Sequence, residues 1–326
     1  MPVIRNRNPR IYGEIVLYAG SACPEMAQEV SNILGVPLSG RDLVRFPNSN
    51  IFCRLHSSAR GQDVYVIQTT PPPVNDNLME LLIMLQTLRL DSVGRLTAVV
   101  PYLCYARSDK KDQPRVPITA RLVADMIEVA GAMRYMTMDL HAGQIQGFFS
   151  IAGDTLTAFH LLSDYFKERS RSMHQPVILT ADLGFAKKAR NFAAKLNIPM
   201  AFIEKRRAGN NSSAEALTIV GDVNDRDVII VDDECDTAGS VTQACRIARE
   251  NGARDIFLSF VHAVLSGPAV ERLRDANFRE IVTTNTIPVP PEKRLPNMNV
   301  LSVAPMLAEV ILRAHEGRSV GELFNE

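Results

Sequence analysis

The chain has 326 residues, 46% of them hydrophobic and 22% charged, which predicts a folded, soluble protein of two domains. Lys+Arg and Asp+Glu both number 36, so net charge gives no attraction to nucleic acid or to a membrane. The five cysteines are scattered and no apolar run is long enough for a signal peptide or membrane span, so we expect a cytoplasmic protein without a disulfide framework.

The first half of the chain alternates strands and helices. Asn75, Asp76 and Asn77 are typical N-cap residues, so we expect them to precede a helix rather than belong to it. Helices are predicted from residue 24, at 78–88 and at 118–130. Strands are predicted at 15–18, 63–68, 96–102 and 135–140.

The alternation begins again in the second half. Helices are predicted at 186–196 and 241–251. Strands are predicted at 177–180, 199–203, 228–231, 256–261 and 281–284. The predicted fold class is therefore α/β, with two similar domains at 1–156 and 157–303, each a mostly parallel sheet flanked by helices.

An acidic strand end followed by a loop of small residues is the strongest functional signal. The apolar run 228–231 leads into Asp232 and Asp233, and the loop 236–240 then opens a helix. Open α/β sheets bind ligands at this end of their strands, where a loop and a helix N-terminus surround phosphate with N–H donors. Carboxylates suit ribose hydroxyls or Mg²⁺, so the motif predicts a ribose-phosphate site.

The alternative for this motif is an ordinary turn. A lone Asp-Thr-Ala-Gly, here residues 236–239, is more often a turn at the end of a strand. The apolar strand before it and the helix after it favour the phosphate interpretation.

The motif resembles the phosphoribosyl-diphosphate (PRPP) binding loop of the type I phosphoribosyltransferase fold. From about Gly20 to Phe324 the chain resembles the ribose-phosphate pyrophosphokinase family. The resemblance implies two phosphoribosyltransferase-like domains, with residues 304–326 and their helix folding back onto the first. It also implies that ribose 5-phosphate is bound by Asp232, Asp233, Asp236, Thr237, Ala238, Gly239 and Ser240.

Two strand ends are candidates for a metal site. His141 follows the strand at 135–140, and Asp182 follows the strand at 177–180. A lone histidine at a strand end is more often structural, and Mg²⁺ prefers oxygen ligands. The resemblance implies that His141 and Asp182 hold the Mg²⁺ bound to ATP.

Three cations, Lys205, Arg206 and Arg207, precede a polar stretch at 208–211. A solvated charge run is the usual explanation for such a cluster. A closing loop that carries cations is what diphosphate transfer needs, because charge develops on the transferred group. The resemblance implies that Lys205 and Arg207 act in this way.

Two further loops are candidates for binding ATP. The resemblance implies that Phe46, Asn48, Arg107 and Ser108 position the nucleotide, with Arg107 able to stack on a purine or bind phosphate. Three positions depart from the family: Asn50 replaces Glu, Ser108 replaces Gln and Phe185 replaces Gly. We expect a phenylalanine at 185 to crowd the approach of a phosphate to the backbone, which glycine permits.

Ser58 and Arg60 resemble part of the family's regulatory anion site between subunits. Leu90 stands where that site has another basic residue, and an ordinary polar turn is an equal alternative for Ser58 and Arg60. The family forms rings of dimers, so we expect a homo-oligomer.

The predicted activity is transfer of diphosphate from Mg-ATP to the anomeric hydroxyl of ribose 5-phosphate, giving PRPP and AMP. One alternative is a non-catalytic regulatory homologue, which the departures at Asn50, Ser108 and Phe185 suggest. A second alternative is a purine-salvage phosphoribosyltransferase, which shares the loop but not the doubled architecture.

Overall fold

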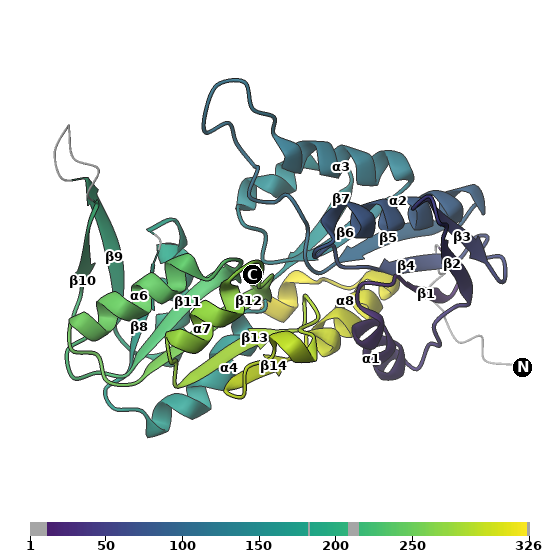
Figure 1. Cartoon of the computed structure of the whole chain (residues 1–326). Coiled ribbons are helices and arrows are strands. Elements are labelled where there is room, and N and C mark those ends of the chain that lie inside the picture. The colour runs from purple at the N-terminus through teal and green to yellow at the C-terminus, as the bar shows by residue number, and fades with distance from the viewer. Residues whose placement is uncertain (1–11, 182, 208–214, 325–326) are drawn as a thin grey trace, which may run out of the picture. The chain divides into compact units, whose positions relative to one another are not determined.

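The computed structural model describes residues 12–181, 183–207 and 215–324, and the chain forms two compact units (Figure 1). The first unit contains the chain up to Leu156 together with the segment from Val303. The second unit is Thr157–Ser302. Both units are helix-covered and built on sheets that are mostly parallel, so the predicted fold class is confirmed.

A five-stranded sheet, parallel throughout, forms the centre of the first unit, in the order β1-β4-β5-β6-β7. Its middle strands are buried along their whole length, as expected for apolar runs covered on both faces. A separate antiparallel hairpin of β2 and β3 was not predicted. The strands are β1 Ile15–Ala19, β2 Arg41–Arg45, β3 Ile51–Leu55, β4 Asp63–Ile67, β5 Arg95–Val100, β6 Arg134–Met138 and β7 Ala152–Leu156.

Helices cover both faces of this sheet. α2 and α3 pack together on one face, and α1 and α8 pack together as a second pair. The predicted cap at Asn75–Asn77 is wrong, because the helix already begins at Val74 and those residues form its first turn. The helices are α1 Pro24–Leu34, α2 Val74–Leu90, α3 Thr119–Ala130 and α8 Ala304–Glu316, with short 3₁₀ turns η1 Gly143–Phe148 and η5 Gly321–Phe324.

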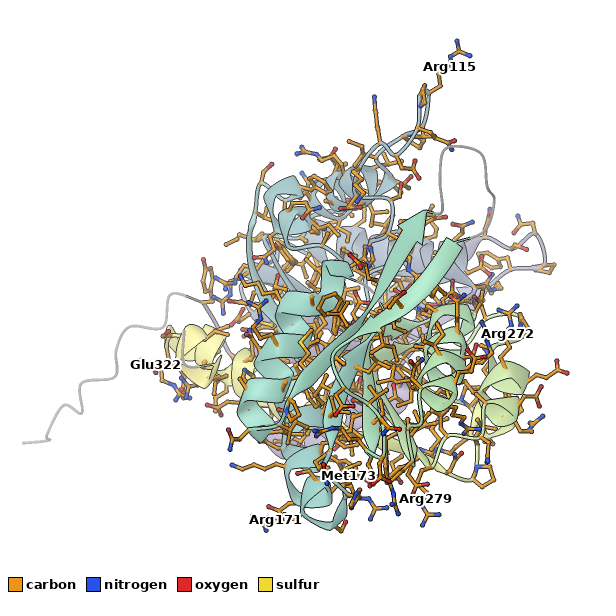
Figure 2. The ribbon with its side chains drawn as sticks, turned by 90° about the vertical axis from the view of Figure 1, so that its left-hand side faces the viewer. Arg115, Arg171, Met173, Arg272, Arg279 and Glu322 are labelled. Atoms are coloured by element: carbon orange, nitrogen blue, oxygen red, sulfur yellow. The ribbon has the colours of Figure 1, made fainter. Side chains whose placement is uncertain are left out.

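The second unit has a seven-stranded sheet in the order β10-β9-β8-β11-β12-β13-β14, in which β10 alone runs antiparallel to its neighbour. The connections that lead into β8 and β13 lie at the same edge of the sheet, where Figure 2 places Met173 and Arg279. The strands are β8 Val177–Thr180, β9 Met200–Arg207, β10 Glu215–Val220, β11 Val228–Cys235, β12 Ile256–Ala263, β13 Glu280–Thr284 and β14 Met298–Leu301.

Its helices also cover two faces. α6 and α7 contribute buried residues to one core with the even-numbered positions of β11 and β12. α4 packs against α5, and Phe166 of α4 contacts Phe257 on the other face of β12. None of the described helices is long and apolar enough to cross a lipid bilayer. The helices are α4 Phe159–Arg169, α5 Ala186–Leu196, α6 Gly239–Glu250 and α7 Ala269–Asp275, with 3₁₀ turns η2 Ser170–Ser172, η3 Leu183–Phe185 and η4 Pro291–Lys293.

A buried polar cluster holds α8 against the first unit. Asp63 is fully buried, accepts from Arg95 Nε at 2.7 Å and lies 2.8 Å from Nδ1 of His315 on α8. Arg95 Nη2 also donates to the carbonyl of Ala314 at 3.0 Å. Burial raises the pKa of Tyr65, whose hydroxyl donates to Asp63. The last helix is therefore tied to β4 and β5 by charge-assisted bonds.

This cluster predicts a large cost for removing its carboxylate. We expect Asp63→Ala to lower the free energy of unfolding by about 3 kcal/mol, because Arg95 loses its buried counter-ion. Urea unfolding followed by circular dichroism measures the change. Asp125→Ala, which breaks an exposed pair with Arg121 on α3, is the control and leaves the unfolding midpoint almost unchanged. Equal shifts for both variants would contradict the assigned role of Asp63.

Candidate active site

The acidic residues of the central motif lie inside a strand. β11 runs to Cys235, so the prediction that the strand ends at Val231 is wrong. β12 supplies the reason, since it pairs with β11 from Val228 to Cys235 and bonds its backbone groups throughout. Asp233 and Glu234 are buried, and Asp232 is half-buried. The carboxylates are thus fixed by sheet pairing rather than carried on a loop.

β11 extends past the end of its other neighbour. β8 pairs with β11 only from Val228 to Ile230 and ends at Thr180. Asp232 therefore lies beyond the last paired position of β8, at the carboxyl edge of the sheet. A step of this kind at the carboxyl ends of parallel strands is where α/β sheets accommodate ligands.

The loop after β11 is anchored to the segment that follows β12. The N–H of Leu265 donates to the carbonyl of Cys235, and the N–H of Ser266 donates to the carbonyl of Asp236, both at 3.0 Å. The hydroxyl of Ser266 donates to the carboxylate of Asp236. Asp236 therefore shapes the loop through its own side chain.

The backbone turns sharply into α6 at Ala238. This buried residue has φ 60°, in the left-handed region that L-residues other than glycine rarely adopt. α6 begins at the next residue, and in this fully described segment no side chain caps its N-terminus. Thr237 and Ser240 are exposed beside that N-terminus. Uncapped N–H donors and two hydroxyls together form an anion-binding arrangement.

The predicted nucleotide loops of the first unit meet each other. Arg107, Ser108 and Asp109 follow β5, and His141 follows β6, its parallel neighbour. Nε2 of Gln144 donates to Oδ2 of buried Asp109 at 2.5 Å, which joins the two loops. Arg107 and His141 are both exposed at this edge.

The first turn of α2 links the Phe46 loop to the Arg107 loop. Asp76 pairs with Arg45 at 2.9 Å, beside Phe46, and Asn75 accepts from the hydroxyl of Tyr105 at 2.6 Å. Phe46 is 46% exposed, as a platform for a planar ligand requires. The polar residues predicted to cap α2 instead contact two of the candidate ATP-binding loops.

Two of the predicted ATP-binding side chains have structural partners. The hydroxyl of Ser108 lies 3.2 Å from that of Thr119 and also accepts the Thr119 N–H at the start of α3. Oδ1 of Asn48 accepts the N–H of Asn50 within its own turn. Both residues therefore stabilise the shape of their loops.

Phe185 packs among other aromatic rings, and its predicted effect on the approach of a phosphate to the backbone stays a prediction. Its side chain is buried, 5.3 Å from the ring of Phe159 between centroids, and the Nζ of Lys188 lies 5.6 Å from its ring. The ring packs into the α4–α5 layer because that layer already contains other aromatic rings. Asp182, the predicted metal ligand nearby, lies outside the described residues.

Lys205 and Arg207 lie on an extension of β9. β9 pairs with β8 only as far as Phe202, and beyond this its partner is β10, with Lys205 opposite Leu217. The stretch 208–211, predicted to be a closing loop, lies outside the described residues. The backbone thus places both cations past the carboxyl end of β8.

The described residues offer few protein ligands for a metal ion. Within residues 12–181, 183–207 and 215–324, no group of three or more His, Cys, Asp or Glu side chains is placed to hold a metal. Mg²⁺ bound to substrate phosphates needs only one or two protein ligands, since it keeps several waters. His141 of the first unit is exposed and Asp232 of the second unit is half-buried, so each could supply one ligand within its own unit.

The candidate regulatory residues are engaged by an acidic group. The hydroxyl of Ser58 lies 3.0 and 3.1 Å from the two carboxylate oxygens of Asp91. Arg60 is exposed and its backbone bridges to Val93. A carboxylate at this position disfavours a second anion at Ser58.

Comparisons with known proteins agree along the whole chain. The model for the N-terminal domain of ribose phosphate pyrophosphokinase matches residues 15–131, and that for the phosphoribosyl synthetase-associated domain matches 210–325. A ribose-phosphate pyrophosphokinase of Caldanaerobacter subterraneus subsp. tengcongensis is 45% identical over 315 residues, 97% of this chain and 99% of the relative. One from Campylobacter jejuni is 45% identical over 94% of this chain and 98% of its own.

This chain belongs to the ribose-phosphate pyrophosphokinase family. The crystal structure of phosphoribosylpyrophosphate synthetase from Mycobacterium smegmatis has a TM-score of 0.89 and 41% identity, covering 93% of this chain and 99% of that chain. The suspected family is thereby confirmed, and it is a family of enzymes.

The residues that support the loop after β11 were not predicted from the sequence. Ser266 and Arg272 lie after β12 and hold Asp236 and Thr237, the latter through a 3.0 Å bond from Arg272 Nη1 to the Thr237 carbonyl. Ser266-Gly267-Pro268 follows an apolar strand and precedes a helix. That strand–turn–helix pattern was the available signal.

The left-handed backbone at Ala238 gives a matched test of the loop geometry. Ala238→Gly and Ala244→Gly each remove one buried methyl, but Ala244 lies in the right-handed interior of α6. We expect Ala244→Gly to lower the free energy of unfolding by about 2 kcal/mol more than Ala238→Gly, because glycine relieves strain at 238 and loses helix stability at 244. Urea unfolding measures both, and equal losses would refute the left-handed assignment.

Proposed function

We propose that this chain transfers diphosphate from Mg-ATP to the anomeric hydroxyl of ribose 5-phosphate, giving PRPP and AMP. The observation that carries the proposal is the anchored loop at the uncapped N-terminus of α6, directly after the acidic strand β11. The family supplies the reaction class, and the loop supplies a site for a phosphorylated pentose.

The ribose 5-phosphate side lies in the second unit. N–H groups of Gly239 and Ser240 in the first turn of α6 bind the 5-phosphate, with the exposed hydroxyls of Thr237 and Ser240 as further donors. Asp236 and Ala238 give the loop its shape. Asp232 and Asp233 accept hydrogen bonds from the ribose hydroxyls, because carboxylates are acceptors only.

The ATP side lies in the first unit. Phe46 stacks on the base, Asn48 and Ser108 hold the loops around it, and Arg107 binds the phosphate chain. His141 contributes to the magnesium–nucleotide complex, with Asp182 as the expected second ligand. Mg²⁺, when bound, neutralises phosphate charge and orients the triphosphate.

The reaction requires no covalent intermediate. The anomeric hydroxyl attacks the β-phosphorus in line, and AMP leaves with the bond electrons on its phosphate oxygen. Lys205 and Arg207 stabilise the negative charge that develops on the transferred group, where positioned cations lower the barrier most.

The three departures from the family do not disrupt the local structure. The Phe185 side chain is buried in the α4–α5 layer. The differences at Asn50 and Ser108 lie in well-formed turns rather than in broken ones. We also propose that the protein is cytoplasmic and forms a homo-oligomer, as the family implies. Light scattering of the purified protein tests the oligomeric state.

An end-point assay tests the activity directly. With purified protein, Mg²⁺, ATP and ribose 5-phosphate, we expect equal amounts of AMP and PRPP. Absence of AMP, with binding of both ligands demonstrated by calorimetry, would favour the regulatory homologue. Release of diphosphate from PRPP and a purine base would instead indicate a salvage phosphoribosyltransferase. Replacing ATP by other nucleoside triphosphates determines the nucleotide preference.

The proposed role of Lys205 predicts a specific kinetic change. We expect Lys205→Ala to lower kcat about 10²-fold or more with little change in either KM, because the cation acts on charge that develops during transfer. Lys195→Ala on α5, whose ammonium pairs with Asp164 at 2.9 Å, is the control and retains full turnover. An unchanged kcat in Lys205→Ala would remove that residue from the mechanism.

A further inference from the structure

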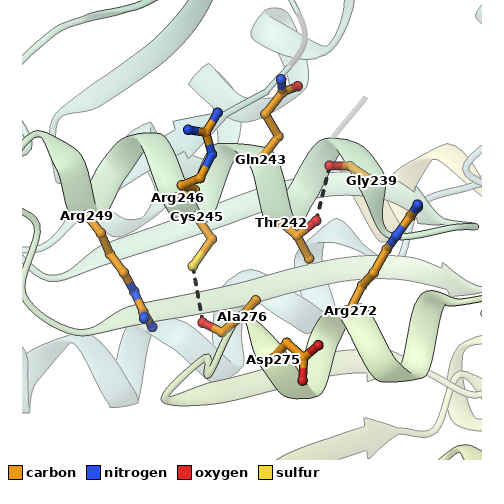
Figure 3. A pocket seen from close by; sticks show the side chains of 9 residues that line it. All are labelled: Gly239, Thr242, Gln243, Cys245, Arg246, Arg249, Arg272, Asp275 and Ala276. Carbon is orange, nitrogen blue, oxygen red and sulfur yellow. Dashed lines mark hydrogen bonds between the residues drawn. The ribbon is translucent and has the colours of Figure 1, made fainter.

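A groove of about 800 Å³ separates α6 from α7 in the second unit (Figure 3). Thr242, Cys245, Arg246 and Arg249 line it from α6, and Arg272 and Asp275 line it from α7. It shares Gly239 with the ribose 5-phosphate loop, and none of the acidic residues of β11 lines it. Three arginines against one aspartate leave the lining with an excess of positive charge.

Two of these arginines are held by neutral groups. Arg249 donates to the carbonyl of Asn277 at 2.7 Å, and Arg272 donates to the carbonyl of Thr237 at 3.0 Å. Within the described part of the chain, neither guanidinium is paired with a carboxylate. Since a guanidinium has five donors and each uses few here, both retain charge and donors for a ligand.

Nearby arginines behave differently. Arg246 pairs with Glu250 at 2.9 Å, and Arg254 pairs with Asp225 at 3.2 Å. Arg279 lies 3.9 Å from Asp255. Their charges are largely compensated, so among the three arginines that line the groove the uncompensated charge lies at Arg249 and Arg272.

The two guanidiniums lie toward opposite ends of the groove. In Figure 3, Arg272 extends from α7 toward Gly239, and Arg249 extends from the far part of α6 toward α7. Gly239 and Arg249 are ten residues apart, about 15 Å along the helix axis. Between them the Cys245 thiol donates to the Ala276 carbonyl at 3.6 Å, and Asp275 is the one acidic residue among the described residues that line the groove.

We propose that the groove binds a small organic bisphosphate, with one phosphate at Arg249 and the other at Arg272. The two separated cations match a molecule whose negative charges lie at its two ends. A single phosphate satisfies one end only. The hydroxyl of Thr242 already donates to the Ala238 carbonyl at 2.7 Å, so the arginines provide the recognition.

Occupation of the groove acts on the ribose 5-phosphate loop through Arg272. This step rests on the proposed function, since Thr237 belongs to the loop that binds the 5-phosphate. A charged phosphate is a stronger acceptor than a neutral carbonyl, so a bisphosphate draws Arg272 away from Thr237. The loop then loses one of its anchors, and its affinity for ribose 5-phosphate falls.

The test uses the full-length protein and fructose 1,6-bisphosphate as the probe, with calorimetry at fixed ionic strength. We expect the probe to bind and to raise the Kd of ribose 5-phosphate about fivefold or more. Arg249→Ala weakens probe binding about tenfold or more, because one charge-assisted bond is lost, while the Kd of ribose 5-phosphate without probe stays unchanged. Arg171→Ala, which removes one exposed charge elsewhere on this unit, behaves like the unmodified chain (Figure 2).

Several results would overturn the proposal. They are no binding of the probe, equal probe affinity in Arg249→Ala, equal affinity for inorganic phosphate, and an unchanged Kd of ribose 5-phosphate. Arg249→Gln replaces Arg249→Ala if the alanine variant does not fold. Failure of ribose 5-phosphate itself to bind the unmodified protein would instead contradict the proposed function, because probe binding is measured separately.

Discussion

The parallel pairing of β11 with β12 is the constraint on which the second unit depends. It continues to Cys235, five residues past the last contact of β11 with β8, and it keeps three acidic residues in an extended backbone. The same pairing brings the segment after β12 beside the segment after β11. Leu265, Ser266 and Arg272 then hold the loop after β11 by backbone and side-chain bonds. One sheet contact thus positions both the carboxylates and the loop.

In the first unit, side-chain contacts rather than strand pairing bring the candidate ATP-binding loops together. Its candidate ATP-binding residues come from a hairpin loop and from the ends of two parallel strands, which are far apart in sequence. The first turn of α2 joins two of these loops through Asn75 and Asp76, and Gln144 joins the third through Asp109. These polar side chains connect the loops to one another, while Phe46, Arg107 and His141 are exposed.

Arg272 connects the loop after β11 to a second surface. One guanidinium contacts the loop that we assign to ribose 5-phosphate and also lines the α6–α7 groove. Such sharing allows a ligand in one place to change affinity in the other without any large movement. Arg249 lines the groove but does not contact the loop. Substituting Arg249 therefore tests binding in the groove separately from binding at the loop.

The sequence by itself determined the fold class, the family and the position of the phosphate motif. Apolar runs such as 228–231 and 256–261 are local signals, because burial on both faces leaves no polar alternation, and the loop 236–240 carries its chemistry in consecutive residues.

Only the tertiary structure decided what those residues contact. That Asp236 is held by Ser266, that Asn75 and Asp76 brace loops instead of capping a helix, and that Phe185 packs into a core all depend on residues distant in sequence. No local sequence pattern predicts the α6–α7 groove, because Arg249 and Arg272 lie on different helices. Folding also decides that each of these arginines contacts a backbone carbonyl.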